Sequence, residues 1–369
     1  MRWIAAWLLL ALLSTECGGT RPAAFRQPRA SAKPAAPPMR AIAPSAAPSP
    51  SPAPGLRLDD ETWFAYPGVN VAERRGTALD ASTLLDAPAG KHGVLRHQGE
   101  DFVFADGKRT RFWGMSITDQ MNFPNKEQAD FMAEFCAQLG FNLVRHQLLD
   151  AAGSRHNIFG SDRDATQELD PERLDRFDYL IAQLIRRGIY LDVDFIAQRK
   201  PLAKDGVQEP DKVEPGYKLV GEFDEALIQN QERFVRQLLT HQNPYTARRY
   251  ADEPALVMTT ITNESSLFSL GDWGQGELKS GYHRRLLQTL YNEWLAKKYT
   301  DRAKLEARWA PASEELEKLG LQSEEDPSAG SVAPIFDFSD RSREYEKYSK
   351  ARVLDNYTFI YEIETGFDQ

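Results

Sequence analysis

The chain has 369 residues, of which 41% are hydrophobic and 11% aromatic, enough apolar side chain for one large core and a smaller unit. Its formal net charge is -9 and it has no long run of Lys and Arg, which argues against nucleic acid and anionic membrane surfaces as partners, because binding to phosphates needs concentrated positive charge. The two cysteines, Cys17 and Cys136, cannot form a disulfide framework.

The first 17 residues have the pattern of a signal peptide. Met1 and Arg2 precede an apolar run at residues 3–13, which is too short to span a bilayer comfortably and suits a secretory signal. Cys17 follows SerThrGlu and precedes GlyGlyThr, which resembles a bacterial lipoprotein cleavage site, although Glu16 stands where a small residue is typical. A chain tethered by a lipid on Cys17 and a freely secreted chain are both open, and each predicts an extracellular or cell-envelope location.

Two further segments precede the main domain. Residues 18–55 are predicted to be a linker, since ten of the 22 prolines and eleven alanines fall between residues 21 and 55 with few large apolar residues among them. Residues 56–108 are predicted to be a small β-rich preamble, in which AspGlyLys at 106–108 is a hairpin turn between two strand-like runs.

From residue 109 to residue 369, strand and helix patterns alternate at first in the manner of βαβ units, which predicts an α/β fold with a parallel sheet. Cys136 falls on the apolar side of the first of these helices and is predicted to be a core residue. The expected strands cover residues 111–118, 141–148, 189–196 and 255–262, and the expected helices cover 126–139, 171–188 and 225–241.

Asp192 and Asp194 alternate along the third expected strand and therefore project to the same face of the sheet. No His or third carboxylate accompanies them at ligand spacing, so we predict no metal site and favour a role as buried hydrogen-bonding partners of neighbouring strands. Residues 198–224 follow as a polar insertion with several prolines, which predicts a long loop at the carboxyl ends of the strands.

The fourth expected strand ends abruptly in Asn263 and Glu264. Its apolar, β-branched run predicts a strand that is buried on both faces, as in parallel sheets. A carboxylate at the C-terminal end of such a strand lies where barrel enzymes keep their chemistry, so Glu264 is the first catalytic candidate. The alternative is that Asn263 and Glu264 are the turn and helix-capping residues that a βα loop needs.

Four motifs in chain order resemble the strand signatures of clan A glycoside hydrolases, especially cellulase-like enzymes of family 5. They are PheTrpGly at 112–114, GlyPheAsnLeuValArg at 140–145, ArgGlyIleTyrLeuAspValAsp at 187–194, and TyrAlaAspGluProAlaLeu at 250–256 followed by ThrAsnGlu at 262–264. The segment at 291–309 is also similar to the helical part of related β-galactosidase-type enzymes. The resemblance covers residues 84–369.

This resemblance implies a (β/α)8 barrel, a β-linked carbohydrate substrate, no cofactor, and a retaining mechanism. Glu264 is then the general acid and base, and a second carboxylate about 5 Å away is the nucleophile. Asn263 is implied to hydrogen-bond the sugar 2-hydroxyl, and Arg145 to stabilise the charge of the nucleophile. Trp113 is implied to offer an aromatic face to a sugar, with a core role as the alternative, and the same two roles are open for His146.

Two features depart from the family pattern. The third strand lacks the histidine that many family 5 enzymes have, and only four convincing strands precede Gln369, since charged helical patterns follow Phe268. We therefore expect the N-terminal half of a barrel, truncated after the fourth βα unit, with its nucleophile beyond residue 369 and no activity by itself. The alternative function is a non-catalytic carbohydrate-binding or scaffold protein built on a partial barrel.

Overall fold

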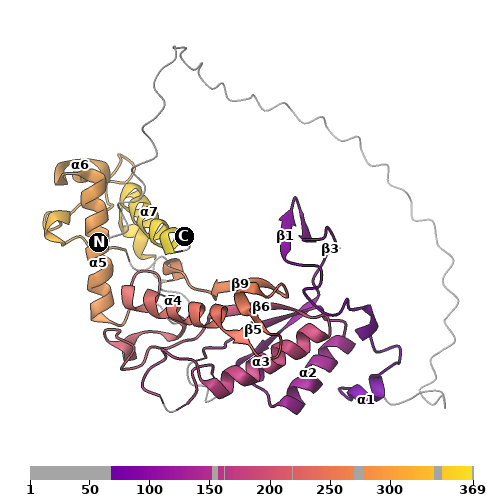
Figure 1. Ribbon diagram of the computed structural model, residues 1–369. Helices are drawn as coiled ribbons and strands as arrows, with labels where there is room; N and C mark the ends of the chain where they lie inside the picture. The colour runs from indigo at the N-terminus through magenta and orange to yellow at the C-terminus, as the bar shows by residue number, and fades with distance from the viewer. Residues whose placement is uncertain are drawn as a thin grey trace, which may run out of the picture. The chain divides into compact units, whose positions relative to one another are not determined.

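The computed structural model describes residues 68–151, 157–161, 163–217, 219–269, 278–335 and 343–367 (Figure 1). The predicted signal peptide, Cys17, the linker and residues 56–67 of the preamble lie outside these ranges. Residues 66–369 separate as one unit from residues 1–65, so that the preamble and the sheet belong to the same unit.

The centre of the fold is a parallel sheet of four strands that lie side by side in chain order, in the order β4-β5-β6-β9. The predicted α/β class is correct, and each strand and helix predicted for this region is present with slightly different ends. The strands are β4 (Gly114–Thr118), β5 (Leu143–Gln147), β6 (Tyr190–Ile196) and β9 (Leu256–Thr262), and the helices between them are α2 (Lys126–Gln138), α3 (Pro171–Arg186) and α4 (Glu225–Thr240).

Each of these helices begins at a side chain that caps its first turn. Asn125 and Gln128 form a reciprocal capping box at the start of α2. Asp170 caps α3 and is followed by Pro171 at the first helical position, and Asp224 caps α4. Because these bonds are local, the helix starts could be located from the sequence.

The helices pack on one face of the sheet, which we call the helix face (Figure 1). Its side chains contact all three helices: the Cys136 thiol of α2 donates to Met115 Sδ at 3.6 Å, His146 meets Phe177 of α3, and Phe195 meets Phe234 of α4. Cys136 is buried, as predicted for a core residue, and burial raises the pKa of its thiol to about 11.

The opposite face of the sheet is polar, and we call it the polar face. Alternate residues of a strand point to opposite sides, and the register places the polar side chains in neighbouring positions across all four strands. Ser116 lies opposite Arg145, Arg145 opposite Asp192, and Asp194 opposite Thr260. Ser116 is exposed and Arg145 is partly exposed, so this face is open to solvent in part.

One prediction for β9 was wrong, because the strand is not buried on both faces. Thr259 is exposed and Ile261 is 49% exposed, while the remaining side chains of the strand are only partly buried. The physical reason is its position: β9 pairs with β6 on one side, and no strand of the described residues pairs with its other edge.

The preamble forms an antiparallel sheet, with β1 (Leu95–Gln98), β2 (Asp101–Phe104) and β3 (Arg109–Thr110) in chain order. The predicted turn joins β2 to β3, with Gly107 at a φ of 89°, a conformation that glycine adopts without strain. Phe104 stacks on Tyr190 with 5.1 Å between ring centroids. The preamble therefore packs where the parallel strands begin.

The region after β9 is helical, as predicted. Its main helices are α5 (Gly281–Tyr299), α6 (Arg302–Trp309) and α7 (Lys350–Phe367). The buried Arg352 of α7 pairs with Glu325 at 2.6 Å and lies over the ring of Trp309. Among the described residues beyond 269, strand pairing is limited to a single bridge between Leu319 and Tyr348.

The remaining short elements are α1 (Val71–Arg74) and the two-stranded ribbon of β7 (Gln242–Asn243) and β8 (Arg248–Arg249). No helix in the described part of the chain is long and apolar enough to cross a membrane. A closed barrel is not present in the described residues, which establish an α/β sheet with helices on one face.

Candidate active site

Arg145 is the centre of a hydrogen-bond network at the carboxyl ends of β5, β6 and β9. Its Nε donates to Asp194 Oδ1 at 2.9 Å and its Nη2 donates to Asp194 Oδ2 at 2.7 Å. The same Nη2 donates to Asn263 Oδ1 at 3.1 Å. One guanidinium thus joins three neighbouring strands, and the two parallel bonds to Asp194 fix its plane.

The two side chains of the Arg145–Asp194 pair differ in their exposure to solvent. The Asp194 side chain is fully buried, whereas the Arg145 side chain keeps a third of its surface exposed. The hydrogen bond to Asp194 raises the pKa of Arg145, and the charges of Asp194, Asp192 and Glu264 add to this effect. Burial raises the pKa of the neighbouring Asp192, and the Asp194 charge raises it further. The predicted role of the two aspartates as partners of neighbouring strands is therefore confirmed for Asp194.

Asn263 is held from two sides. Its backbone N–H donates to the Ile196 carbonyl at 2.8 Å, and its Oδ1 accepts from both Arg145 and Gln147, the latter at 3.2 Å. Asn263 therefore does not act as a helix cap, which was one of the alternatives. Gln147 was not predicted as a site residue, although its spacing of two from Arg145 places it on the same face of β5.

Glu264 directly follows Asn263 and is exposed. Its φ is 55°, in the left-handed region that costs a side-chain-bearing residue about 1–2 kcal/mol. Glycine would fit this position without strain, so the presence of a carboxylate there is consistent with a functional role. The charge of Glu264 also contributes to the raised pKa of Arg145.

His146 does not reach this network. It lies on the helix face, fully buried, with Nδ1 3.0 Å from Asn122 Oδ1 and its ring edge-on to Phe177. Since Asn122 Nδ2 donates to the Gln147 carbonyl, Asn122 Oδ1 is the acceptor and His146 Nδ1 the donor. The structure favours the core role over substrate binding, because residues 145 and 146 point to opposite faces.

Trp113 is also remote from the network. It is 67% exposed, so it is not the core residue of the alternative prediction, and it stacks on Phe141. However, it precedes β4, and the pairing of Gly114 with Leu143 places it at the amino ends of the parallel strands. Five residues of strand separate it from the carboxyl ends, about 15 Å. The predicted sugar contact by Trp113 at this site is therefore wrong.

Asp150 is another acidic residue near the strand ends, and it was not predicted from the sequence. It is buried and accepts backbone hydrogen bonds from residues 197, 198 and 199 at 2.9–3.0 Å, which fixes the start of the 198–224 insertion. Despite these bonds, burial raises the pKa of Asp150. Arg199, in the same insertion, is buried and donates to the Asn230 carbonyl at 2.7 Å.

No group of three or more His, Cys, Asp or Glu side chains in the described ranges could hold a metal ion.

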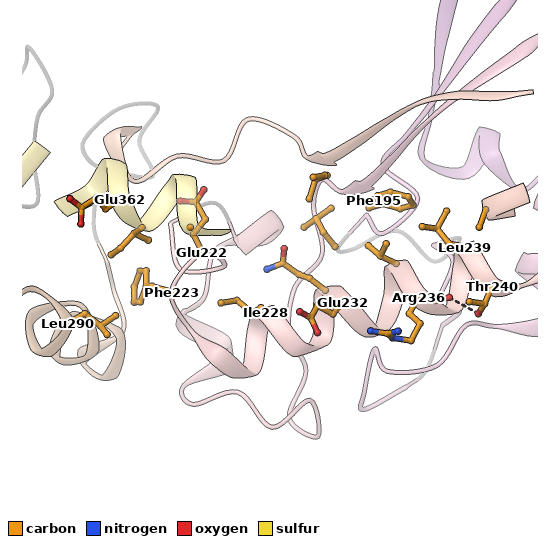
Figure 2. A pocket seen from close by; sticks show the side chains of 17 residues that line it. Phe195, Glu222, Phe223, Ile228, Glu232, Arg236, Leu239, Thr240, Leu290 and Glu362 are labelled. Atoms are coloured by element: carbon orange, nitrogen blue, oxygen red, sulfur yellow. Dashed lines mark hydrogen bonds between the residues drawn. The ribbon is translucent and has the colours of Figure 1, made fainter. Parts of the chain in front are cut away.

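A cavity of about 940 Å³ lies on the helix-face side of the sheet, between α4, β9, α5 and α7 (Figure 2). Phe195 and Ile261 contribute to its wall from the helix face, and Glu232, Leu290 and Glu362 contribute from the helices. None of the predicted site residues lines it, so this cavity and the strand-end network are separate features.

Comparison with known proteins gives partial structural similarities only. No protein-family model matches the sequence, and no curated protein does. Three similar solved structures are an endo-1,4-β-mannanase from Rhizomucor miehei (17% identity, TM-score 0.39), an endo-β-1,4-mannanase from Thermotoga petrophila (19%, 0.33) and a family 5 glycoside hydrolase from Bacteroides vulgatus (20%, 0.33).

These alignments cover 56%, 52% and 53% of this chain, and 58%, 41% and 37% of the respective solved chains. The chain thus spans less than two thirds of the length of each. At these TM-scores the overlap is too partial to establish a common fold.

The Arg145–Asp194 pair is expected to stabilise the sheet. Asp194→Ala should lower the free energy of unfolding by about 2–3 kcal/mol, because Arg145 loses both bonds to a charged partner and is only partly hydrated. Urea unfolding of Asp194→Ala, Arg145→Ala and the double variant measures the coupling. Asp164→Ala, which breaks the exposed pair with Lys204, is the matched control and should cost less than about 1 kcal/mol. Strictly additive losses at residues 145 and 194 would contradict the coupling.

His146 should make stability depend on pH. Burial lowers the pKa of His146 to about 3, whereas an exposed histidine has a pKa of 6.5, so between pH 6.5 and 3 the unfolded state binds more protons. Stability should therefore fall as the pH falls through this window, by up to about 1.4 kcal/mol for each pH unit. Urea unfolding at pH 7, 6 and 5 should show a shallower loss in His146→Gln, which keeps a donor for Asn122. Equal slopes in the two proteins would refute this role.

Proposed function

We propose that this chain carries the acid/base residue of a retaining glycoside hydrolase that acts on β-glycosidic bonds of oligo- or polysaccharides. The observation that carries the proposal is the position of Glu264, an exposed carboxylate at the end of a parallel strand, directly after Asn263, which accepts a hydrogen bond from Arg145. In barrel enzymes, catalytic groups lie at this end of the strands. The motifs that resemble clan A glycoside hydrolases place an acid/base residue at the same point.

In this mechanism Glu264 acts twice. Its carboxyl group first donates a proton to the glycosidic oxygen, while a second carboxylate attacks the anomeric carbon and the bond to the leaving group breaks. The Glu264 carboxylate then removes a proton from water, whose oxygen attacks the anomeric carbon and releases the second carboxylate. Asn263, whose Oδ1 accepts hydrogen bonds from Arg145 and Gln147, is the residue proposed to contact the sugar 2-hydroxyl.

The second carboxylate is not found among the described residues at the strand ends. Asp194 is fully buried and bound to Arg145, and Asp150 is buried and bound to three backbone amides. Asp192 lies further from the strand end and is mostly buried. The nucleophile is therefore expected from residues outside the described ranges.

The same observation supports the second candidate function, carbohydrate binding without hydrolysis. A polar sheet face with a fixed Arg145 and Asn263 could hold a sugar whether or not a nucleophile is present. The two functions differ in one property, since only the first requires proton transfer by Glu264.

The experiment supplies the nucleophile from solution. The purified chain, at neutral pH with aryl β-glycosides and sodium azide, should form α-glycosyl azide, because azide attacks the anomeric carbon while Glu264 protonates the leaving group. Without azide, turnover should be absent. Glu264→Gln should reduce product formation about 100-fold or more with a poor leaving group such as phenol, and much less with 2,4-dinitrophenol, whose departure needs no proton. Nuclear magnetic resonance of the product gives its anomeric configuration.

His97→Gln, an exposed change in the preamble, is the control and should behave as the wild type. Equal product formation by wild type and Glu264→Gln with the poor leaving group would contradict the assignment. Binding of oligosaccharides without any azide product would favour the non-catalytic function. Turnover without azide, well above the Glu264→Ala control, would show that the chain contains its own nucleophile.

We also propose that the protein is exported and either lipid-anchored at Cys17 or released. The apolar run at residues 3–13 and the Pro- and Ala-rich linker support this proposal. In fractionated native cells, a cleaved species is expected in the envelope or the medium, and Cys17→Ser should abolish membrane association if a lipid is attached. An uncleaved chain found only in the cytosol would rule out export.

A further inference from the structure

One face of α7 carries exposed apolar and aromatic side chains. Leu354, Tyr357 and Tyr361 are 55%, 36% and 61% exposed, and their spacing of three and four residues places them on the same side of the helix. Exposed tyrosines on successive turns form a patch of large rings that meets water. The packing of α7 does not explain this exposed patch, because the side chains that the helix buries are others, among them Arg352, Asn356 and Phe359.

This face is joined to the segment that carries Glu264. Glu364 of α7 accepts two hydrogen bonds with its Oε1, from Ser266 Oγ and from the Leu267 backbone N–H, both at 2.8 Å. One residue further on, Phe268 stacks on Tyr357, with ring centroids 5.3 Å apart and planes inclined by 23°. Two consecutive contacts therefore hold residues 266–268 against α7, immediately after Glu264.

We propose that Tyr357 and Tyr361, with Phe268 beside them, form a sugar-stacking subsite next to Glu264, and this inference rests on the proposed function. We call these three residues the α7 platform. Tyr361 offers the more exposed ring, and Tyr357 connects it to Phe268 and hence to the Glu264 segment. A saccharide whose scissile bond lies at Glu264 would extend along the platform with its neighbouring rings.

The chemistry of the platform suits a carbohydrate. A pyranose ring has an apolar C–H face and a rim of hydroxyls, and tyrosine likewise combines an apolar ring with a polar tip. The flanking positions Thr358 and Thr365 are polar and uncharged, with hydroxyls that donate to the Leu354 and Tyr361 carbonyls at 2.8 Å. Thr358 and Thr365 therefore add hydroxyl groups, and no charge, beside the rings.

The platform predicts a loss of oligosaccharide affinity that depends on the rings. Cellohexaose and mannohexaose, used as probes, are titrated into the full chain, and dissociation constants are measured by calorimetry for wild type, Tyr357→Ala, Tyr361→Ala and Tyr361→Phe. Each alanine variant should bind at least one probe about threefold to tenfold more weakly, the range expected for loss of one stacked ring. Tyr361→Phe, which keeps the ring, should bind within about twofold of wild type.

Trp113→Ala is the matched control. It removes an exposed aromatic ring of similar accessibility at the opposite end of the strands, so it should leave affinity unchanged. Thermal unfolding of each variant checks folding. Tyr361→Ala should stay folded because Tyr361 is mostly exposed, whereas Tyr357→Ala also loses the stack on Phe268, so Tyr361→Ala is the decisive variant. Light scattering is measured in parallel, since the same patch could instead hold two copies of the chain together.

Equal affinities in wild type and both alanine variants would overturn the platform, as would the absence of binding by the wild type at millimolar probe. A change in oligomeric state with unchanged sugar binding would assign the patch to self-association instead. Failure of the proposed function is a separate result, because it is the loss of Glu264-dependent azide product. If binding depends on the two tyrosine rings but no azide product forms, the α7 platform is supported and the proposed hydrolase function is contradicted.

Discussion

The arrangement at the strand ends depends on the ion pair between Arg145 and Asp194. Asp194 is fully buried, and such a carboxylate is tolerated in a fold only when a positive partner and good hydrogen bonds accompany it. Arg145 supplies two bonds in one plane, and the same guanidinium then positions the Asn263 side chain. Because these residues belong to three different strands, the pair fixes the relative register of the strands as well as the geometry of the polar face.

The two faces of the sheet have different chemistry because neighbouring residues of a strand point to opposite sides. On β5, Arg145 joins the polar network, whereas His146 is buried against Phe177. On β6, Asp194 points to the polar face, whereas Phe195 packs against Phe234 of α4 on the helix face. This separation explains why the cavity of about 940 Å³ is not at the candidate active site. The cavity lies on the helix face along the partly covered β9, and residues of α4 and α7 line it together with Ile261 (Figure 2).

The segment after β9 connects this sheet with the helical region that ends the chain. Glu264 has a left-handed backbone, a conformation that a glutamate holds only when its surroundings compensate the strain. Asn263 fixes the chain on one side of it through the Ile196 carbonyl, and Glu364 of α7 fixes it on the other side through Ser266 and Leu267. The helical region after residue 280 therefore contacts the strand-end segment, because α7 binds Ser266 and Leu267, which follow Glu264.

Features that depend on local interactions could be predicted from the sequence alone. Caps such as Asp170 and Asp224 bond within three residues, and alternation within a strand is a local pattern, so the four strands, their helices and the strand-end position of Glu264 were located correctly. Features that depend on distant contacts were decided only by the tertiary structure. They are the partners of Arg145, the burial of His146, the remoteness of Trp113, the exposure of β9 and the hydrogen bond that Ser266 donates to Glu364. All of them follow from which strands and helices become neighbours. No local pattern contains this information, because the residues involved are up to 118 positions apart in the chain.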